Sequence, residues 1–202
     1  MNGQNPGVGP KPIAETRVLV GEGREEVLFF GALLVHLGIH GIQVEECKGK
    51  DGLPLYLRTL KVRTGFAGLM KLGIVRDADD NPTGAASRVD TAVAQAGFPA
   101  HIAVTRLILP GAGKPGALEN LCLETIAGHP IETCIETFIE CAARATRITH
   151  SGTTRKAKAR VRTWLASHAE PDLRLGHVAE KGWLNWDAPP FAELIQFFRA
   201  LA

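Results

Sequence analysis

Residues 72–82 read Leu72-Gly73-Ile74-Val75-Arg76-Asp77-Ala78-Asp79-Asp80-Asn81-Pro82. The mostly apolar run at its start is bounded by turn-forming residues, and it predicts a buried strand. Three acids follow, and Asn81-Pro82 then breaks the chain. In an open α/β sheet, ligands bind at the carboxyl ends of the strands, so Asp77 and Asp79 are expected at the edge of a crevice. Carboxylates crowded there repel one another, and a hard cation such as Mg²⁺ relieves that repulsion.

Length and composition indicate one globular unit. The 202 residues are 45% hydrophobic and 22% charged, which suits a single α/β domain with a helical extension. A formal net charge of +2 gives no global electrostatic signature, so nucleic-acid binding would have to rest on local patches. No apolar run reaches the roughly 18 residues that a membrane helix needs, so no membrane contact is expected.

The amino-terminal segment and the cysteines indicate the compartment. Residues 1–14 are polar and rich in Gly and Pro, without the apolar core of a signal peptide, so we expect a disordered lead before a single domain at 15–202. The cysteines have apolar neighbours and lack Cys-x-x-Cys spacing, which predicts buried thiols in a cytoplasmic protein. They are Cys47, Cys122, Cys134 and Cys141.

Strand and helix patterns alternate along the first part of the chain. Strands are expected at 16–20, 42–47, 70–75 and 102–109, with helices at about 27–37, 53–62 and 84–96. This alternation predicts an α/β fold with a mainly parallel sheet flanked by helices, and a core at about 15–126. Residues 127–202 read as a helical extension, with helices at 130–146, 153–168 and about 191–201 after a short helix at 118–126.

A second group of acids follows the first expected strand. Glu22 comes directly after it, and Glu26 lies four residues later, on the same face of a helix that begins near Gly23. Acids are also favoured at a helix N-terminus by the macrodipole, and Asp77 to Asp80 would suit a capped turn. Because both acidic groups fall at strand ends, joint binding of a divalent cation is the favoured interpretation.

These residues resemble the Toprim domain, which pairs a Glu after its first strand with a later Asp-x-Asp. The resemblance rests on residues 18–27, Val-Leu-Val-Gly-Glu-Gly-Arg-Glu-Glu-Val, and on Asp77-Ala78-Asp79. Toprim proteins include topoisomerases, DnaG-type primases, OLD-family nucleases and RecR proteins. Residues 110–121, 157–160 and Trp186-Asp187 extend the similarity to the uncharacterised Toprim-like family DUF3226, over nearly all of residues 17–201.

The resemblance implies a Toprim-like, Rossmann-type sheet with a metal site for Mg²⁺ or Mn²⁺. Glu22, Asp77 and Asp79 match the metal ligands, and Glu26 matches an acid that joins the site in OLD-like nucleases. Glu119 follows the next strand and is a further candidate ligand, although it also suits a solvated first helical turn. The chain departs from the usual pattern at Gly21, which separates the apolar strand from Glu22 and leaves the direction of that Glu open.

A run without acids spans residues 143–168 and carries a basic helix. Arg155, Lys158 and Arg162 share a face by helical spacing, with Lys156 beside them, and such a stripe can neutralise the phosphates of a nucleic acid. Lys158 could also stabilise charge that develops on a transferring phosphoryl group. The alternative is a solvated helix face that offsets the acidic site.

Two classes of function therefore stand. One is a Mg²⁺-dependent nuclease acting on DNA or RNA, with Glu22, Asp77, Asp79 and Lys158 as its catalytic groups. The other is a non-catalytic module that binds nucleic acid or a protein, as RecR-type domains do. A phosphatase or glycosyltransferase that uses Asp-x-Asp is a third reading. The only tyrosine, Tyr56, is remote from the acids, which argues against covalent strand passage. OLD-type relatives add a partner ATPase as a candidate, and the oligomeric state is left open.

Overall fold

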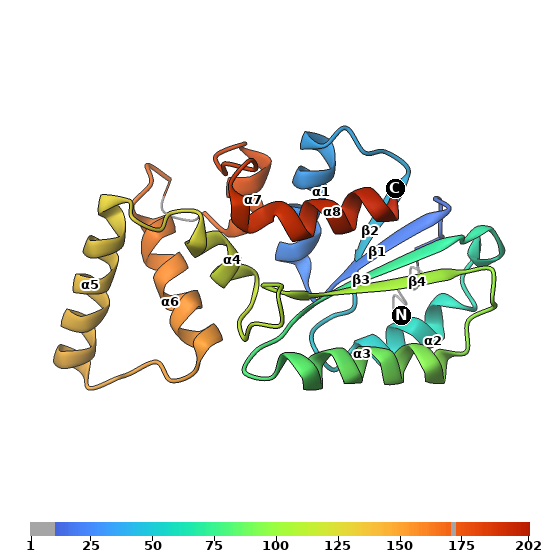
Figure 1. Ribbon diagram of the computed structural model, residues 1–202, viewed down its shortest axis with the longest axis horizontal. Helices are drawn as coiled ribbons and strands as arrows, with labels where there is room; N and C mark the ends of the chain where they lie inside the picture. Colours follow the sequence, from blue (N-terminus) through green and yellow to red (C-terminus); the bar gives the residue numbers. More distant parts are fainter. Residues whose placement is uncertain (1–10, 171–172) are drawn as a thin grey trace, which may run out of the picture.

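A computed structural model describes residues 11–170 and 173–202 (Figure 1). Its centre is a four-stranded sheet with the strand order β2-β1-β3-β4, in which every neighbouring pair is parallel. The strands are β1 (Arg17–Gly21), β2 (Ile42–Glu46), β3 (Lys71–Asp77) and β4 (Ala103–Leu109). This is the Rossmann-like α/β architecture that the alternating pattern predicts, so the predicted fold class is confirmed at that level.

Helices fill the connections and the carboxyl-terminal half. Those between the strands are α1 (Arg24–His36), α2 (Leu53–Leu60) and α3 (Pro82–Ala96), with the short 3-10 turn η1 (Phe66–Gly68) before β3. After the sheet come α4 (Leu118–Glu124), α5 (Pro130–Thr146), α6 (Thr153–Ala166), α7 (Leu175–Glu180), η2 (Pro189–Phe191) and α8 (Ala192–Leu201). The patterns predict these helices to within a few residues, except that α7 was not expected.

The sheet is covered on both faces because its strands alternate their side chains between two apolar clusters. Leu19 and Val75 join the cluster beneath α1, α7 and α8. Val20 and Ile74 join the cluster beneath α2 and α3. In Figure 1 these two helical layers lie above and below the strands. A buried β3 with apolar residues on both faces explains why its sequence is a continuous apolar run rather than an alternating one.

The helices α4, α5 and α6 lie at the carboxyl end of the sheet, to the left in Figure 1. Helix α4 packs against α6, and α6 packs against α5. Trp164 of α6 is buried in the apolar cluster that joins these helices to the sheet. This position places the basic helix beside the strand ends that carry the acids.

Part of the segment that we assigned to the amino-terminal lead is attached to the domain. Residues 1–10 lie outside the described residues, but 11–14, which we assigned to the lead, are attached to the domain. Ile13 is buried, and its N–H donates to the carbonyl oxygen of Thr64 at 2.8 Å. The amide of Gln43 donates to the Pro12 carbonyl at 3.0 Å and accepts from the Ala14 N–H at 2.7 Å. One apolar side chain among polar neighbours is a weak signal, which is why the pattern missed it.

Two of the four thiols are not buried. Cys47 and Cys122 are buried as predicted, whereas Cys134 and Cys141 are exposed on α5. Only Ile135 is buried on that helix, because α5 contacts the rest of the protein through a narrow apolar stripe. The apolar neighbours of these cysteines in sequence therefore lie on a different helical face. Among the helices of the described segments, none combines the length and apolar character needed to cross a bilayer.

Candidate functional site

Five carboxylates from four segments gather at the carboxyl end of the sheet, and we call them the acidic edge. Glu22 follows β1, Glu26 lies in the first turn of α1, Asp77 ends β3, Asp79 lies in the next turn, and Glu119 begins α4. Parallel strands deliver their carboxyl ends to one side of the sheet, so acids distant in sequence become neighbours there. All five were candidate metal ligands from sequence.

Gly21 brings the two glutamates together. It is the last residue of β1, and α1 passes so close that an added Cβ would lie 2.8 Å from the Glu26 Cβ and 3.1 Å from the Phe30 ring. Real Cβ atoms do not approach that closely, so only glycine allows this packing. The glycine between the apolar strand and Glu22 therefore has a structural reason, because it lets the first turn of α1 lie against the strand end.

Asp77 is the most deeply buried member of the acidic edge. Burial raises its pKa well above the ordinary value, and the charges on Glu22, Glu119 and Glu26 raise it further. The opposing contribution is a hydrogen bond at 3.1 Å that the Leu118 N–H donates to its Oδ1. A carboxylate held in this surrounding has few compensating contacts from the protein, which indicates a site for a cationic partner.

Arg76 is a residue whose role sequence reasoning missed. Its Nε lies 3.0 Å from Glu22 Oε1, and both side chains are largely buried. Burial raises the pKa of Glu22 and the Arg76 charge lowers it, but with Glu26 and Asp79 nearby the result is a raised pKa. The signal was present in the sequence as an arginine inside an apolar strand, where a buried charge needs a partner. The pair fixes the direction of Glu22.

Lys158 from α6 faces the acidic edge. Its Nζ lies 3.9 Å from Glu119 Oε1. Burial lowers the pKa of this amine, but the charges on Glu119, Asp77, Glu26 and Asp79 outweigh that and raise it. Burial also raises the pKa of Glu119, against the charge of Lys158. The lysine therefore lies within electrostatic range of four of the five acids. Its predicted role as an electrostatic helper stays a prediction.

The turn after β3 is fixed by its backbone. Asp79 has a left-handed φ of 50°, and its N–H and carbonyl pair with Gly116 at 2.8 and 2.7 Å. Asp79 thus joins the end of β3 to the segment that leads into α4. A non-glycine residue in this conformation is uncommon, and Asp tolerates it better than most. The bridge holds the Asp-x-Asp motif beside Glu119.

The donor chemistry of the acidic edge suits a hard divalent cation, but the side chains are engaged with the protein. Glu22 contacts Arg76, Asp77 accepts from Leu118, and Glu26 accepts from the Gly23 N–H at 3.0 Å. Within residues 11–170 and 173–202, no three His, Cys, Asp or Glu side chains are arranged to hold a metal ion as they stand. Binding of a divalent cation at the acidic edge would therefore require side-chain rotations, and the Mg²⁺ site stays a prediction.

The other basic residues predicted to bind nucleic acid lie on the outside of α6. Arg155, Lys156 and Arg162 are exposed, and within the described ranges none forms an ion pair. Arg160, on the same helix, is instead paired with Glu136 of α5 at 2.6 Å. The structure therefore places three free cations on the helix that also presents Lys158 to the acids.

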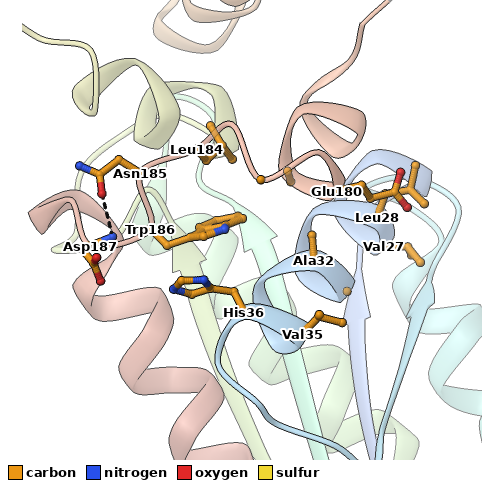
Figure 2. Close-up of a pocket in the computed structure, with 13 residues that line it drawn as sticks. Val27, Leu28, Ala32, Val35, His36, Glu180, Leu184, Asn185, Trp186 and Asp187 are labelled. Atoms are coloured by element: carbon orange, nitrogen blue, oxygen red, sulfur yellow. Dashed lines mark hydrogen bonds between the residues drawn. The ribbon is translucent and has the colours of Figure 1, made fainter.

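A cavity of about 570 Å³ lies outside the acidic edge. Figure 2 shows it between α1 and the segment after α7, with Val27, Ala32 and Val35 on one side. His36 lies beside Trp186, with ring centroids 6.1 Å apart. The lining of the cavity includes Glu180 and Asp187 but none of the acids of the acidic edge. The cavity carries no group that sequence reasoning marked for chemistry.

Family comparison is consistent with the resemblance that the motifs indicate. The family model described as "Protein of unknown function (DUF3226)" matches residues 16–202. The chain belongs to the DUF3226 family. No curated protein and no solved structure matches it significantly. The matched region includes every residue of the acidic edge and the whole of α6. Both therefore lie in the part of the chain that the family model describes.

Proposed function

We propose that this DUF3226 protein is a Toprim-like, Mg²⁺-dependent phosphotransfer enzyme, and specifically a nuclease. The observation that carries the proposal is the position of Lys158 beside carboxylates from α1, the end of β3 and α4. A divalent cation held by Glu22, Asp77 and Asp79, with Glu26 and Glu119 in support, would supply Lewis-acid stabilisation and an activated water. Crowded carboxylates beside one lysine suit that chemistry better than they suit a stable core.

The residues of the chain divide the remaining tasks. Lys158 lies where it can stabilise negative charge on a scissile phosphate. Arg155, Lys156 and Arg162 would hold the flanking phosphates of the strand. Arg76 keeps Glu22 directed along the edge. An open edge of this kind, next to an exposed basic helix, fits an extended polymer better than a small enclosed substrate.

The proposal is tested by nicking of supercoiled plasmid with Mg²⁺ or Mn²⁺. Asp77→Asn should reduce the rate by roughly 10²–10³-fold, the usual loss when one electrostatic group of a site is removed. Asp187→Asn, an exposed acid outside the acidic edge, is the matched control and should leave the rate unchanged. Wild-type protein that binds the metal by calorimetry but never cuts DNA or RNA would contradict the nuclease proposal.

The second candidate is a module that binds nucleic acid without cutting it. The observation in its favour is that Glu22, Asp77 and Glu26 are engaged with protein partners. Among the described residues, three cations on α6 have no ion-pair partner. Binding that is independent of Mg²⁺ and unaffected by Asp77→Asn, together with no cleavage, would favour this function over the enzyme.

A further inference from the structure

A second cavity of about 310 Å³ lies on the other face of the sheet end, between α2 and α3. Its floor includes Arg76, and Ala85 and Ala92 of α3 line it with methyl groups, where longer side chains would fill the space. Leu53 and Pro54 at the start of α2 form an apolar wall, and Ser87 and Thr91 add hydroxyls. A mixed apolar and polar lining of this size is typical of a small-molecule site.

The charge of the lining is positive. Lys50, Arg76 and Arg88 line the cavity against a single acid, Asp51. Lys50 and Arg88 are exposed, and neither has an ion-pair partner in the part of the chain that the structure describes. The start of α2 has no side-chain cap, so its positive end is also uncompensated by a side chain. These features favour an anionic ligand.

Arg76 has one poorly satisfied end. Its Nε meets Glu22 at 3.0 Å and its Nη2 donates to the Lys50 carbonyl at 2.8 Å. Among the described residues its Nη1 reaches only the sulfur of Cys47, at 3.8 Å, and a thiol is a weak acceptor. The residue is 8% exposed, so the cavity that it lines is the open route by which a further partner can reach this guanidinium. A phosphate oxygen is the stronger acceptor for such a donor.

We propose that this cationic pocket, defined by Lys50, Arg76 and Arg88, binds one nucleoside monophosphate unit through its phosphate. The bound phosphate lies beside Arg76, whose neighbour in the chain is Asp77 and whose ion-pair partner is Glu22. The pocket therefore holds a nucleotide next to the acidic edge, across the end of β3. The anion site is inferred from the geometry of the cavity alone. Only the idea that the bound nucleotide comes from a nucleic-acid strand rests on the proposed function.

Calorimetry in EDTA tests the site without any chemistry. Wild-type protein should bind deoxyadenosine monophosphate more tightly than inorganic phosphate. Lys50→Ala/Arg88→Ala should weaken nucleotide binding at least about tenfold, because it removes two cationic donors that can form charge-assisted hydrogen bonds to the phosphate. Arg58→Ala/Arg199→Ala removes the same charge from exposed positions outside the pocket and should bind like wild type. Equal affinity in all three proteins, or inorganic phosphate bound as tightly as the nucleotide, would overturn the proposal.

Two oligonucleotides identify the source of the phosphate. If the pocket takes a strand end, a 5′-phosphorylated oligonucleotide should bind more tightly than its 5′-hydroxyl form, and the difference should vanish in Lys50→Ala/Arg88→Ala. Equal binding of both forms, with the mononucleotide still bound, would assign the pocket to free nucleotides. Asp77→Asn separates the two proposals, since it should reduce nicking by roughly 10²–10³-fold and leave mononucleotide binding in EDTA intact.

Discussion

The carboxylate of Asp80 accepts a hydrogen bond at 3.2 Å from the backbone N–H of Thr153, 73 residues later in the chain. Thr153 is the first residue of α6, whose N-cap position is occupied by Gly152 without a side-chain bond. The acidic stretch after β3 therefore caps the basic helix. This single contact links the position of Lys158 to the loop that carries Asp77 and Asp79.

Removing this cap should loosen α6. Asp80→Ala is expected to cost about 1 kcal/mol, as loss of a helix N-cap usually does. Asp80→Asn keeps an acceptor oxygen and should cost much less. Hydrogen exchange along α6, together with urea unfolding, measures both effects. Equal protection of α6 in the two variants would show that Asp80 does not cap the helix.

The acidic edge should reduce stability when no cation is present. The pKa of Asp77 is raised in the folded state, so at a pH above the ordinary carboxyl pKa its ionisation lowers the free energy of unfolding. This destabilisation disappears as the pH falls to the ordinary carboxyl pKa, where the unfolded chain also becomes protonated. Asp77→Asn removes the charge and keeps an acceptor for Leu118. In EDTA at pH 8 it should raise Tm by about 2–4 °C, as a gain of 1 kcal/mol does in a protein of this size.

Magnesium should reverse the order of the two proteins. The ion binds the folded wild type and stabilises it by mass action, whereas Asp77→Asn has lost a candidate ligand. Thermal unfolding at increasing Mg²⁺ therefore should show a rising Tm for wild type and a flat one for the variant. A variant less stable than wild type in EDTA would mean that repulsion among the acids is not the dominant effect at this position.

A buried ion pair between Glu45 of β2 and Arg63, which follows α2, should make stability depend on pH in the acid range. Arg63 donates two hydrogen bonds of 2.6 Å to the carboxylate oxygens of Glu45, and both side chains are at most 10% exposed. Burial raises the pKa of Glu45, but hydrogen bonds from Arg63, Tyr56 and Gln43 outweigh it, so the pKa lies below its ordinary value. A lowered carboxyl pKa contributes stability above the unfolded value, near pH 4.3, which is lost as the pH falls through the folded value.

Glu45→Gln should therefore destabilise the protein by about 3 kcal/mol at pH 7, since it leaves a buried Arg63 without a counter-charge. The difference from wild type should shrink below about pH 4, where wild-type Glu45 is itself being protonated. Urea unfolding at several pH values measures this. A difference that stays constant from pH 7 to pH 3 would show that the charge of Glu45 is not what stabilises the fold.

Gly21 offers a test of how the acidic edge is assembled. Gly21→Ala places a Cβ against Glu26 and Phe30, which should cost about 1–3 kcal/mol and displace the first turn of α1. Gly31 of α1 has nothing within 4 Å of an added Cβ, so Gly31→Ala should stabilise the protein by about 0.5–1 kcal/mol. Thermal unfolding of the two alanine variants should therefore shift in opposite directions.

How far sequence could predict this site depends on the type of contact. The order of strands and helices follows from apolar periodicity, which fixed Glu22, Asp77 and Asp79 at strand ends. The parallel sheet then made their proximity predictable. The partners of Asp80 and Arg76 depend on tertiary packing between segments far apart in the chain, and no local pattern encodes them. Helix α7 was missed for a related reason, because six residues including Gly176 form a helix only when packed against α1.

The basic face of α6 makes a quantitative prediction for nucleic-acid binding. Each phosphate contact on duplex DNA contributes about 0.9 to the slope of log K against log salt. Arg155→Ala/Arg162→Ala should therefore lower that slope by about 1.8, with little dependence on sequence. Arg199→Ala, an exposed arginine on α8, is the control and should leave the slope unchanged. Because these cations act through charge alone, their loss should weaken binding most at low salt, where charges are least screened. An unchanged slope would show that the basic face of α6 contacts solvent and not a nucleic-acid strand.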